Sequence, residues 1–305
     1  MKFNIFIPDI ILKDFAYVFK KNFNVDCIWI KNKKLEYKKY NAIVVNGGFD
    51  CNKIFLKKFP NLKIISVFGV GYSGVDLDYC KKNKIIITNT PKVLTNDVAD
   101  LALGLMISLS RKIYQGHNFI LDKKWIKKPF TLSTSLTNKT IGVVGMGAIG
   151  KAFSKRARSL KMNVFYHGPN KKNLKYKYYK NLKIMAKNID IMVVTCVGGE
   201  KTKNLINKYV LNFLSPSSLI INVSRGSVIN ENDLLKSLKT NKIAGAALDV
   251  FNDEPAIHKD YYKLKNVILS PHNASGTNET RLKMAVICSQ NIYHYLSNGK
   301  VYNKI

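Results

Sequence analysis

Residues 145–150 have the types and spacing needed to hold a dinucleotide. Gly145, Gly147 and Gly150 form the pattern G-x-G-x-x-G, with Ala148 and Ile149 among the intervening positions. The first glycine permits a tight turn, the second lets the backbone approach a pyrophosphate, and the third lets a helix pack on a strand. The run TIGVV before the pattern and KAFSKRARSL after it fit a strand and a helix, whose first N–H groups favour phosphate. We therefore predict dinucleotide binding; the alternative is a purely structural glycine turn.

The next predicted strand, NVFYH, ends in a position that distinguishes NAD from NADP. NAD-binding chains usually carry an acidic residue there for the ribose hydroxyl, but this chain has His167 and no carboxylate through Lys172. An acid would repel a 2′-phosphate, so its absence favours NADP(H), although NAD(H) stays open and the lysines also fit an ordinary surface. We expect five residues to bind the cofactor here: His167, Gly168, Pro169, Asn170 and Lys171.

Three later segments each place one polar side chain just past a predicted strand. NVSRGSVIN supplies Arg225, ALDVFNDEP supplies Glu254 and LSPHNASGT supplies His272. In doubly wound sheets, ligands bind outside the carboxyl ends of the strands. Each residue alone is typical of a surface or a turn, but their order downstream of a dinucleotide turn indicates a catalytic set.

These motifs resemble those of the D-isomer-specific 2-hydroxyacid dehydrogenases. The resemblance runs from about residue 46 to the C-terminus and includes FGVGYSGVDL, TNTPKVLTNDVADLALGLM, GVVGMGAIGKA, INVSRGSVINENDLLKSL, AGAALDVFNDEP and SPHNAS. Within the family, the chain is most similar to NADP-preferring glyoxylate and hydroxypyruvate reductases, whose second strand also lacks the acid. It departs from the family pattern at Val197, where proline is frequent, and at Asn273, where an apolar residue is common.

The resemblance implies roles for individual residues. Arg225 binds substrate, His272 is the acid/base and Glu254 is its partner. The backbone amides of Val70 and Gly71 hold the substrate carboxylate. The remaining implied residues line the cofactor, the last of them at the nicotinamide end: Cys196, Thr202, Val223, Ser224 and Asp249.

The chemistry of a 2-oxo acid suits these residue types. Its carbonyl takes a hydride at carbon and a proton at oxygen, and histidine ordinarily exchanges a proton near neutral pH. Arg225 offers a planar fork to the carboxylate and the developing alkoxide, which lysine cannot copy. The loop NGGFD, which begins with Asn46 and Gly47, is expected to contact the substituent on C2.

We therefore expect an oxidoreductase that reduces a small anionic 2-oxo acid, of the glyoxylate or hydroxypyruvate type, to the D-2-hydroxy acid with NADPH. One alternative is an NAD-dependent D-2-hydroxyacid dehydrogenase of biosynthesis, which the residue at position 167 disfavours. The other is a non-catalytic, dinucleotide-sensing protein that resembles a corepressor. The presence of all three catalytic side chains favours an enzyme.

The elements that must position these residues alternate along the chain. Short β-branched runs separated by helical stretches predict α/β architecture with two doubly wound parallel sheets. The expected strands are residues 2–7, 42–45, 63–69, 84–88, 140–145, 163–167, 189–195, 218–224, 243–250 and 266–270. Helices at 96–113 and 277–296 follow proline-marked turns and fit the crossings of a hinge.

Two domains with a cleft between them follow from this plan. We expect a flavodoxin-like substrate domain, residues 1–95 plus 275–305, and a Rossmann dinucleotide-binding domain, residues 96–274. In the resembling family, the helix from residue 96 and the arm after it form a two-fold dimer. We therefore expect a homodimer with Trp125 near or in the interface.

The composition of the chain indicates which classes of binding partner to expect. The 305 residues carry a formal net charge of +31, but lysines are spread over the whole chain, which fits an ordinary surface better than selected nucleic-acid binding. Five cysteines without a CxxC motif fit reduced thiols and a cytoplasmic protein. The N-terminus does not resemble a signal peptide, and no apolar run is long enough to span a bilayer. We expect no metal, no nucleic acid and no membrane partner.

Overall fold

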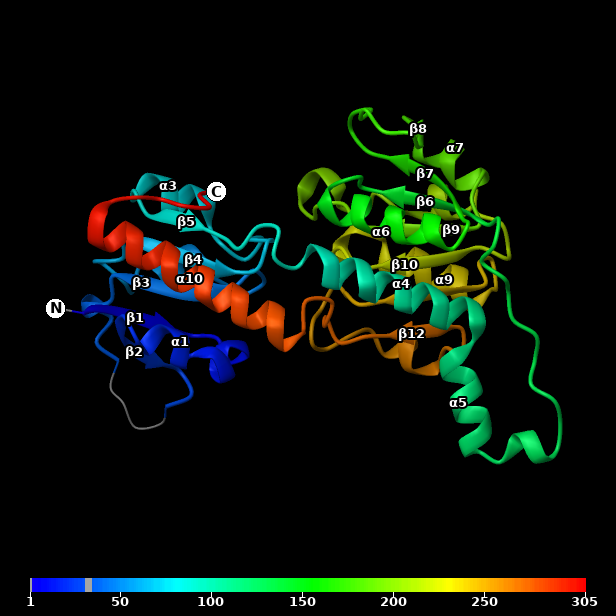
Figure 1. Cartoon of the computed structure of the whole chain (residues 1–305), viewed down its shortest axis with the longest axis horizontal. Helices are drawn as coiled ribbons and strands as arrows, with labels where there is room; N and C mark the ends of the chain where they lie inside the picture. The colour runs from blue at the N-terminus through cyan, green and yellow to red at the C-terminus, as the bar shows by residue number, and fades with distance from the viewer. Residues whose placement is uncertain (1, 31–34) are drawn as a thin grey trace. The chain divides into compact units, whose positions relative to one another are not determined.

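The computed structural model describes residues 2–30 and 35–305, which divide into two compact units. The first unit consists of Met1–Leu94 and Ser275–Ile305, and the second unit is Thr95–Ala274. Each unit contains one sheet whose strands are all parallel in the described residues, with helices packed against it (Figure 1). The predicted fold class of two parallel-sheet α/β domains is confirmed.

The first unit contains a five-stranded sheet in the order β2-β1-β3-β4-β5. This order is that of flavodoxin-like folds. The strands are β1 (Phe3–Ile7), β2 (Phe23–Cys27), β3 (Ala42–Asn46), β4 (Ile64–Phe68) and β5 (Ile86–Thr88). The sequence IISVF of β4 is buried at every position, as expected for a strand covered on both faces.

The helices of the first unit are short except for the last one. They are α1 (Tyr17–Lys20), α2 (Lys53–Leu56), α3 (Leu77–Lys82) and α10 (Asn278–Asn298), with 3₁₀ turns η1 (Ile10–Phe15) and η2 (Tyr37–Lys39). The side chain of Thr277 caps α10 by accepting a hydrogen bond from the Thr280 amide at 3.2 Å. Helix α10 packs against β4, and so returns the end of the chain to the first unit.

The second unit contains a seven-stranded sheet in the order β12-β11-β10-β9-β6-β7-β8. The strands are β6 (Thr140–Val144), β7 (Asn163–His167), β8 (Lys177–Tyr179), β9 (Ile191–Val194), β10 (Leu219–Asn222), β11 (Gly245–Leu248) and β12 (Val267–Leu269). The order is that of a Rossmann fold with one further strand. The direction of strand succession reverses between β6 and β9, so the sequence places its glycine turn at this switch point.

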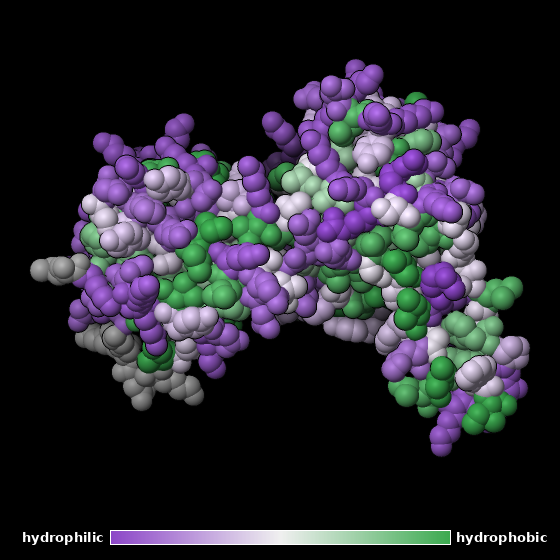
Figure 2. Space-filling model, viewed as in Figure 1, coloured by the Kyte–Doolittle hydropathy of each residue, from purple (hydrophilic) through white to green (hydrophobic). Residues whose placement is uncertain are grey.

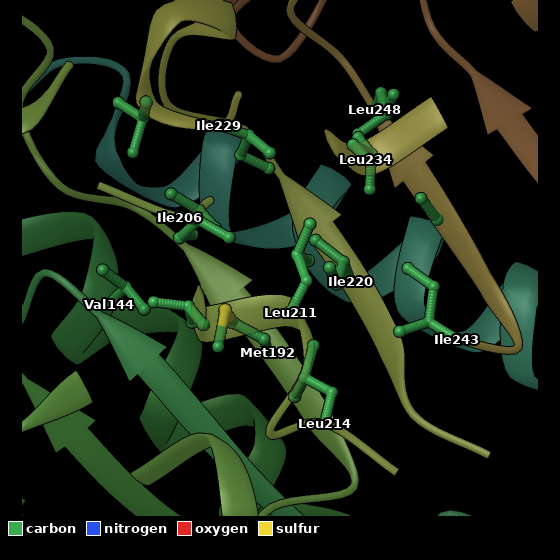
Figure 3. Close-up of a cluster of buried hydrophobic side chains, with 14 of the residues drawn as sticks. Val144, Met192, Ile206, Leu211, Leu214, Ile220, Ile229, Leu234, Ile243 and Leu248 are labelled. Atoms are coloured by element: carbon green, nitrogen blue, oxygen red, sulfur yellow. The ribbon is translucent and has the colours of Figure 1, made fainter. Parts of the chain in front are cut away.

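Helices cover both faces of this second sheet (Figure 1). They are α4 (Thr95–Arg111), α5 (Ile113–Leu121), α6 (Ala148–Ser159), α7 (Leu182–Lys187), α8 (Lys208–Leu211) and α9 (Glu231–Lys239). The 3₁₀ turns are η3 (Lys124–Ile126), η4 (Glu200–Thr202), η5 (Gly226–Val228) and η6 (Lys259–Lys263). Between the strands and α7–α9 lies an aliphatic core in which Val144, Met192, Ile206, Ile220 and Leu234 are buried together (Figure 3).

Two predicted details differ from the structure. Strands β2 and β8 were not predicted, and both lie at sheet edges. The predicted helix at 96–113 is interrupted: α4 ends at Arg111, and Lys112 adopts left-handed backbone geometry with φ 54° before α5 begins. A left-handed residue redirects the chain, so α4 and α5 are separate helices.

The outer faces of both units are largely hydrophilic in the view of Figure 2. Hydrophobic side chains gather at α5 and η3, where Ile120, Leu121, Trp125 and Ile126 are exposed. Within residues 2–30 and 35–305, no helix combines the length and apolar character that crossing a bilayer requires.

Candidate active site

The glycine turn between β6 and α6 leaves room for a ligand at its middle glycine. Gly145 has φ +101°, and a Cβ there would collide with the backbone of Cys196. A Cβ on Gly150 would collide with the Gly145 carbonyl oxygen, whereas a Cβ on Gly147 would have no atom within 4 Å. Gly147 also caps α6 without a side-chain hydrogen bond, so no capping side chain occupies the donors of the first turn. These features fit the pyrophosphate of a dinucleotide.

The residues after β7 form a loop that is fastened at both ends. The Gly145 amide donates to the His167 carbonyl at 2.9 Å, which joins the end of β7 to the glycine turn. The Tyr178 hydroxyl donates to the Gly168 carbonyl at 3.0 Å, and the Lys172 amide donates to the Tyr166 hydroxyl at 2.8 Å. The predicted cofactor residues between these fastenings are exposed: Pro169, Asn170 and Lys171.

Glu254 and His272 form a hydrogen-bonded pair in the loops after β11 and β12. His272 Nδ1 lies 2.5 Å from Glu254 Oε2, and the Phe251 amide donates to Glu254 Oε1 at 2.8 Å. Burial by itself raises the pKa of Glu254, but the hydrogen bond and positive charge of His272, the Phe251 amide and Arg225 together lower it. The carboxylate is therefore held ionised and fixes one ring nitrogen of His272, which leaves Nε2 for another partner.

Arg225 extends from the loop after β10 and is held by its own neighbours. Asn222 accepts from the Ser224 amide and donates to the Arg225 carbonyl, both at 3.0 Å. The guanidinium donates to the Ser224 carbonyl at 2.7 Å, and a Cβ on Gly198 would lie 2.5 Å from Arg225 Cγ. Burial lowers the pKa of Arg225, and the charge of Glu254 opposes this. The structure thus brings the three predicted catalytic side chains into one unit and two of them into direct contact.

Asp249, predicted to meet the nicotinamide end of the cofactor, is fully buried and holds the loop that carries His272. Its Oδ1 accepts from the Ser270 hydroxyl at 2.5 Å and from the Asn273 amide at 2.8 Å. Its Oδ2 accepts from the Ala274 amide at 3.0 Å. Burial raises the pKa of Asp249, although these hydrogen bonds oppose the rise. Between these anchors His272 adopts φ 50°, an uncommon conformation for a histidine that the surrounding bonds maintain.

The other predicted cofactor residues follow β9 and β10. The Ser224 hydroxyl donates to the Cys196 carbonyl at 2.5 Å, which ties the two strand ends together beside the buried Val223. The pKa of the Cys196 thiol is raised by burial. The Thr202 hydroxyl donates to the Val197 carbonyl at 2.7 Å, so it stabilises its own loop. Contact of these side chains with a cofactor stays a prediction.

Apart from Arg225, the predicted substrate residues lie in the first unit. Asp9, buried at the end of β1, accepts hydrogen bonds from both the backbone and the side-chain amide of Asn46. A Cβ on Gly47 would collide with the Gly71 carbonyl oxygen, so these two loops touch. Val70 is partly exposed at the tip of the second loop. The structure therefore brings Asn46, Gly47, Val70 and Gly71 to one edge of this sheet, and their contact with a substrate stays a prediction.

Sequence reasoning did not identify the residues that hold this machinery. Asn222 and Asp9 act through hydrogen bonds of their side chains, and Phe251 acts through its backbone amide. Asn222 could have been recognised from the sequence, because it is an asparagine at the very end of a buried apolar strand, three positions before Arg225. In the part of the chain that the structure describes, no group of three or more His, Cys, Asp or Glu side chains is arranged to hold a metal ion.

Comparison with protein families gives a match over more than half of the chain. The profile described as "D-isomer specific 2-hydroxyacid dehydrogenase, NAD binding domain" matches residues 103–274. This range lies within the second unit and includes the glycine turn, Arg225, Glu254 and His272.

Individual proteins are similar over nearly the full length. Glyoxylate/hydroxypyruvate reductase A of Arabidopsis thaliana is 37% identical over 292 residues, 94% of this chain and 93% of that protein. Hydroxyphenylpyruvate reductase of Plectranthus scutellarioides is 36% identical over 264 residues, 86% and 84% of the two chains. Among solved structures, an NADPH-dependent glyoxylate/hydroxypyruvate reductase of Sinorhizobium meliloti, in complex with NADP and malonate, has a TM-score of 0.91. It is 31% identical and covers 100% of this chain and 97% of its own.

Proposed function

Because the chain belongs to the D-isomer-specific 2-hydroxyacid dehydrogenase family, we propose that it reduces a small 2-oxo acid to the D-2-hydroxy acid with NADPH. The substrate is of the glyoxylate or hydroxypyruvate type. The observation that carries this proposal is the Glu254–His272 pair, which shares a sheet edge with Arg225 and the glycine turn. In this proposal the second unit binds the dinucleotide, and the first supplies the Val70 and Gly71 amides for the substrate carboxylate.

The bound nicotinamide supplies the hydride, and the residues of the chain bind the substrate and move the proton. Since Glu254 occupies Nδ1 of His272, the proton for the substrate oxygen comes from Nε2. The ionised carboxylate of Glu254 favours the imidazolium that this transfer requires. Arg225 places its fork against the substrate carboxylate and the oxygen on which negative charge develops.

Preference for NADPH is supported by the loop after β7. No carboxylate follows His167 up to Lys172, and the Sinorhizobium meliloti reductase with this fold is NADPH-dependent. We expect a lower KM for NADPH than for NADH. His167→Asp adds an acceptor for the ribose hydroxyl and repels the 2′-phosphate, so it reverses the preference.

Steady-state kinetics tests the proposal. Rates are measured on glyoxylate, hydroxypyruvate, pyruvate and 4-hydroxyphenylpyruvate with each cofactor, and the product is assigned by chiral chromatography. Turnover of glyoxylate or hydroxypyruvate with NADPH supports the proposal, provided that the product has the D configuration where the 2-hydroxy acid formed is chiral. Preference for 4-hydroxyphenylpyruvate would instead extend the similarity with the Plectranthus scutellarioides enzyme to its substrate. Cofactor binding with no turnover of any acid would point to the dinucleotide-sensing alternative.

The exposed apolar surface at α5 and η3 supports assembly into a homodimer. Trp125 is 66% exposed in the single chain, beside exposed Leu121 and Ile126. Burial of these side chains against a second copy removes apolar surface from water. Trp125→Asp should give a sedimentation mass of one chain, whereas Ile54→Asp, at a position of the first unit that is at least as exposed, should leave the dimer intact. A parent protein that sediments as a single chain at micromolar concentration would refute this arrangement.

We also assign the protein to the cytoplasm. Cys51, Cys80, Cys196 and Cys288 form no disulfide, and all of these except Cys196 are buried. Unpaired thiols at this frequency suit a reducing compartment.

A further inference from the structure

The ring orientation of His167 at the end of β7 is fixed by a backbone carbonyl. Its Nδ1 lies 3.0 Å from the carbonyl oxygen of Tyr179 on the neighbouring edge strand β8. A carbonyl oxygen only accepts hydrogen bonds, so Nδ1 must carry a hydrogen whatever the charge of the ring. Any gain or loss of a proton therefore takes place at Nε2.

Nε2 of His167 is available to a ligand. Among residues 2–30 and 35–305, no hydrogen bond to this nitrogen is formed. The residue is partly exposed and is joined to the glycine turn through the Gly145 amide at 2.9 Å. The bonds of Tyr166 and Tyr178 hold the loop beyond it. Nε2 of His167 thus lies at the start of a loop that hydrogen bonds hold in place next to the glycine turn.

The elements around β7 offer no acidic partner for a second ring proton. Strands β6 and β8 and helices α6 and α7 pack against β7. Neither these elements nor the loop 168–176 contains an Asp or Glu. Apart from His167, the titratable side chains of these elements and of this loop are all lysine, arginine or tyrosine, among them Tyr166, Lys171, Lys172, Tyr178 and Tyr179.

We propose that His167 selects the cofactor through the protonation of Nε2. With a proton on Nε2, the ring donates to the 2′-phosphate of NADPH and opposes its charge. Without it, Nε2 accepts a hydrogen bond from the 2′-hydroxyl of NADH. The inference rests on the proposed function, since it concerns the same cofactor site.

A coupling between charge and binding follows from this selection. Because the described elements packed against β7 supply no acidic partner, the dianionic 2′-phosphate is the group that stabilises the imidazolium, and NADPH binding takes up a proton from solution. NADH has no such charge and takes up none. By linkage, NADPH affinity must then fall as pH rises above neutrality, by at most about tenfold per pH unit for one proton. The Kd for NADH should stay nearly constant.

Isothermal titration calorimetry at pH 7.5 measures this directly, without turnover. Binding of each cofactor is measured in Hepes and in Tris, whose ionisation enthalpies differ, so the difference in heat gives the number of protons exchanged. We expect NADPH to take up a substantial fraction of one proton and NADH close to none. The 2′-phosphate is mostly dianionic at this pH, since its second pKa is about 6, and contact with cations would make it release protons rather than bind them.

Variants assign the proton to His167. His167→Gln should abolish proton uptake and make the Kd for NADPH independent of pH between 7 and 8.5. His167→Asn can retain a donor toward Tyr179 and should behave in the same way as His167→Gln. This result would distinguish loss of the titratable nitrogen from loss of the hydrogen bond that holds β7 and β8 together. Lys171→Gln should weaken NADPH binding by a similar factor at every pH, because lysine stays charged across this range. His294→Gln, in the first unit, is the matched histidine control and should leave proton uptake unchanged.

Two outcomes overturn the inference. NADPH binding without proton uptake by the parent protein, or uptake that persists in His167→Gln, overturns it alone. Failure of both NADPH and NADH to bind the parent overturns the proposed function and this inference together.

Discussion

The carboxyl edges of the two sheets differ in the chemical groups that they present. At the edge of the second unit, the charged side chains Arg225, Glu254 and His272 stand on loops held by buried polar groups. At the edge of the first unit, glycines bring backbones into contact, as Gly47 does with Gly71. The edge of the first unit therefore offers a shaped surface and backbone amides, and the edge of the second unit offers charged groups and a proton.

This difference predicts which kinetic constant each edge controls. A group that donates a proton acts in the transition state, so its loss lowers kcat. A backbone surface that seats the substrate acts in the bound ground state as well, so its distortion raises KM. Substitutions at the two edges should separate these effects. Loss of the proton donor should cost most, and loss of the carboxylate that supports it should mainly move a pH profile.

His272→Ala removes the proton donor and should reduce kcat by roughly 10²–10⁴-fold, the usual contribution of general acid catalysis. Cofactor affinity should change little, whereas the melting temperature should fall modestly, because Glu254 loses its hydrogen-bond partner. Steady-state rates on the best 2-oxo acid, with a thermal melt of the same preparation, measure both. Retention of most of the parent's kcat would show that the proton comes from elsewhere.

Arg225→Lys keeps the positive charge but loses the fork. A hydrogen bond to a charged group contributes about 1.5–3 kcal/mol, so kcat/KM should fall roughly 10- to 150-fold. Both KM and kcat should change, because the fork contacts the carboxylate and the developing alkoxide. If lysine sustained the parent's kcat/KM, Arg225 would act as a simple counter-charge.

Gly47→Ala tests the edge of the first unit. The new Cβ collides with the Gly71 carbonyl, so one backbone must shift, at a cost of roughly 1–3 kcal/mol for overpacking. We expect a higher KM for the 2-oxo acid and a lower melting temperature, with kcat less affected. Gly48→Ala is the matched control, because its Cβ would meet only Asn46 Oδ1 at 3.4 Å. Equal KM values for the two variants would remove the assigned role of the Gly47–Gly71 contact.

Glu254→Gln changes the pH dependence more than the maximal rate. Removing the carboxylate withdraws support from the protonated ring of His272, so the rate of reduction should decline at a lower pH than in the parent. An alkaline limb that did not move would mean that Glu254 only orients the ring.

Stability provides a second readout for this variant. Because the pKa of Glu254 is lowered in the fold, its ionised form stabilises the protein above the ordinary Glu range near pH 4.3, and this contribution is lost as pH falls through the lowered value. The difference in melting temperature between parent and Glu254→Gln should accordingly be largest near neutrality and shrink in acid.

Buried strands were predictable from the sequence, as were the edge strands β5 and β12, whereas the edge strands β2 and β8 were not. IMVV of β9 and LIIN of β10 are nearly continuous apolar runs, because both faces of a central parallel strand are covered. FNVDC of β2 and KYY of β8 lie at edges, where exposure permits polar and basic residues and removes that signal. The break between α4 and α5 was missed because Lys112 has no marked preference for left-handed geometry.

The candidate site was predictable where chemistry selects the residue type. The glycine spacing and the order of Arg225, Glu254 and His272 mark the second unit. The supporting bonds were not predictable, because they depend on which atoms the fold brings together. Tyr179, whose carbonyl fixes the ring of His167, lies on β8. Because β8 was not predicted, this hydrogen bond could not be predicted either.

The attachment of β7 to the glycine turn is made by backbone atoms alone, from the Gly145 amide to the His167 carbonyl. Every residue type supplies a carbonyl at position 167, so the side chain there can be exchanged while Gly145 keeps this bond and the pyrophosphate turn keeps its form. On the role proposed for His167, single substitutions at this position therefore change which coenzyme is bound, without rebuilding the loops of Glu254 and His272 at the opposite end of the same sheet edge.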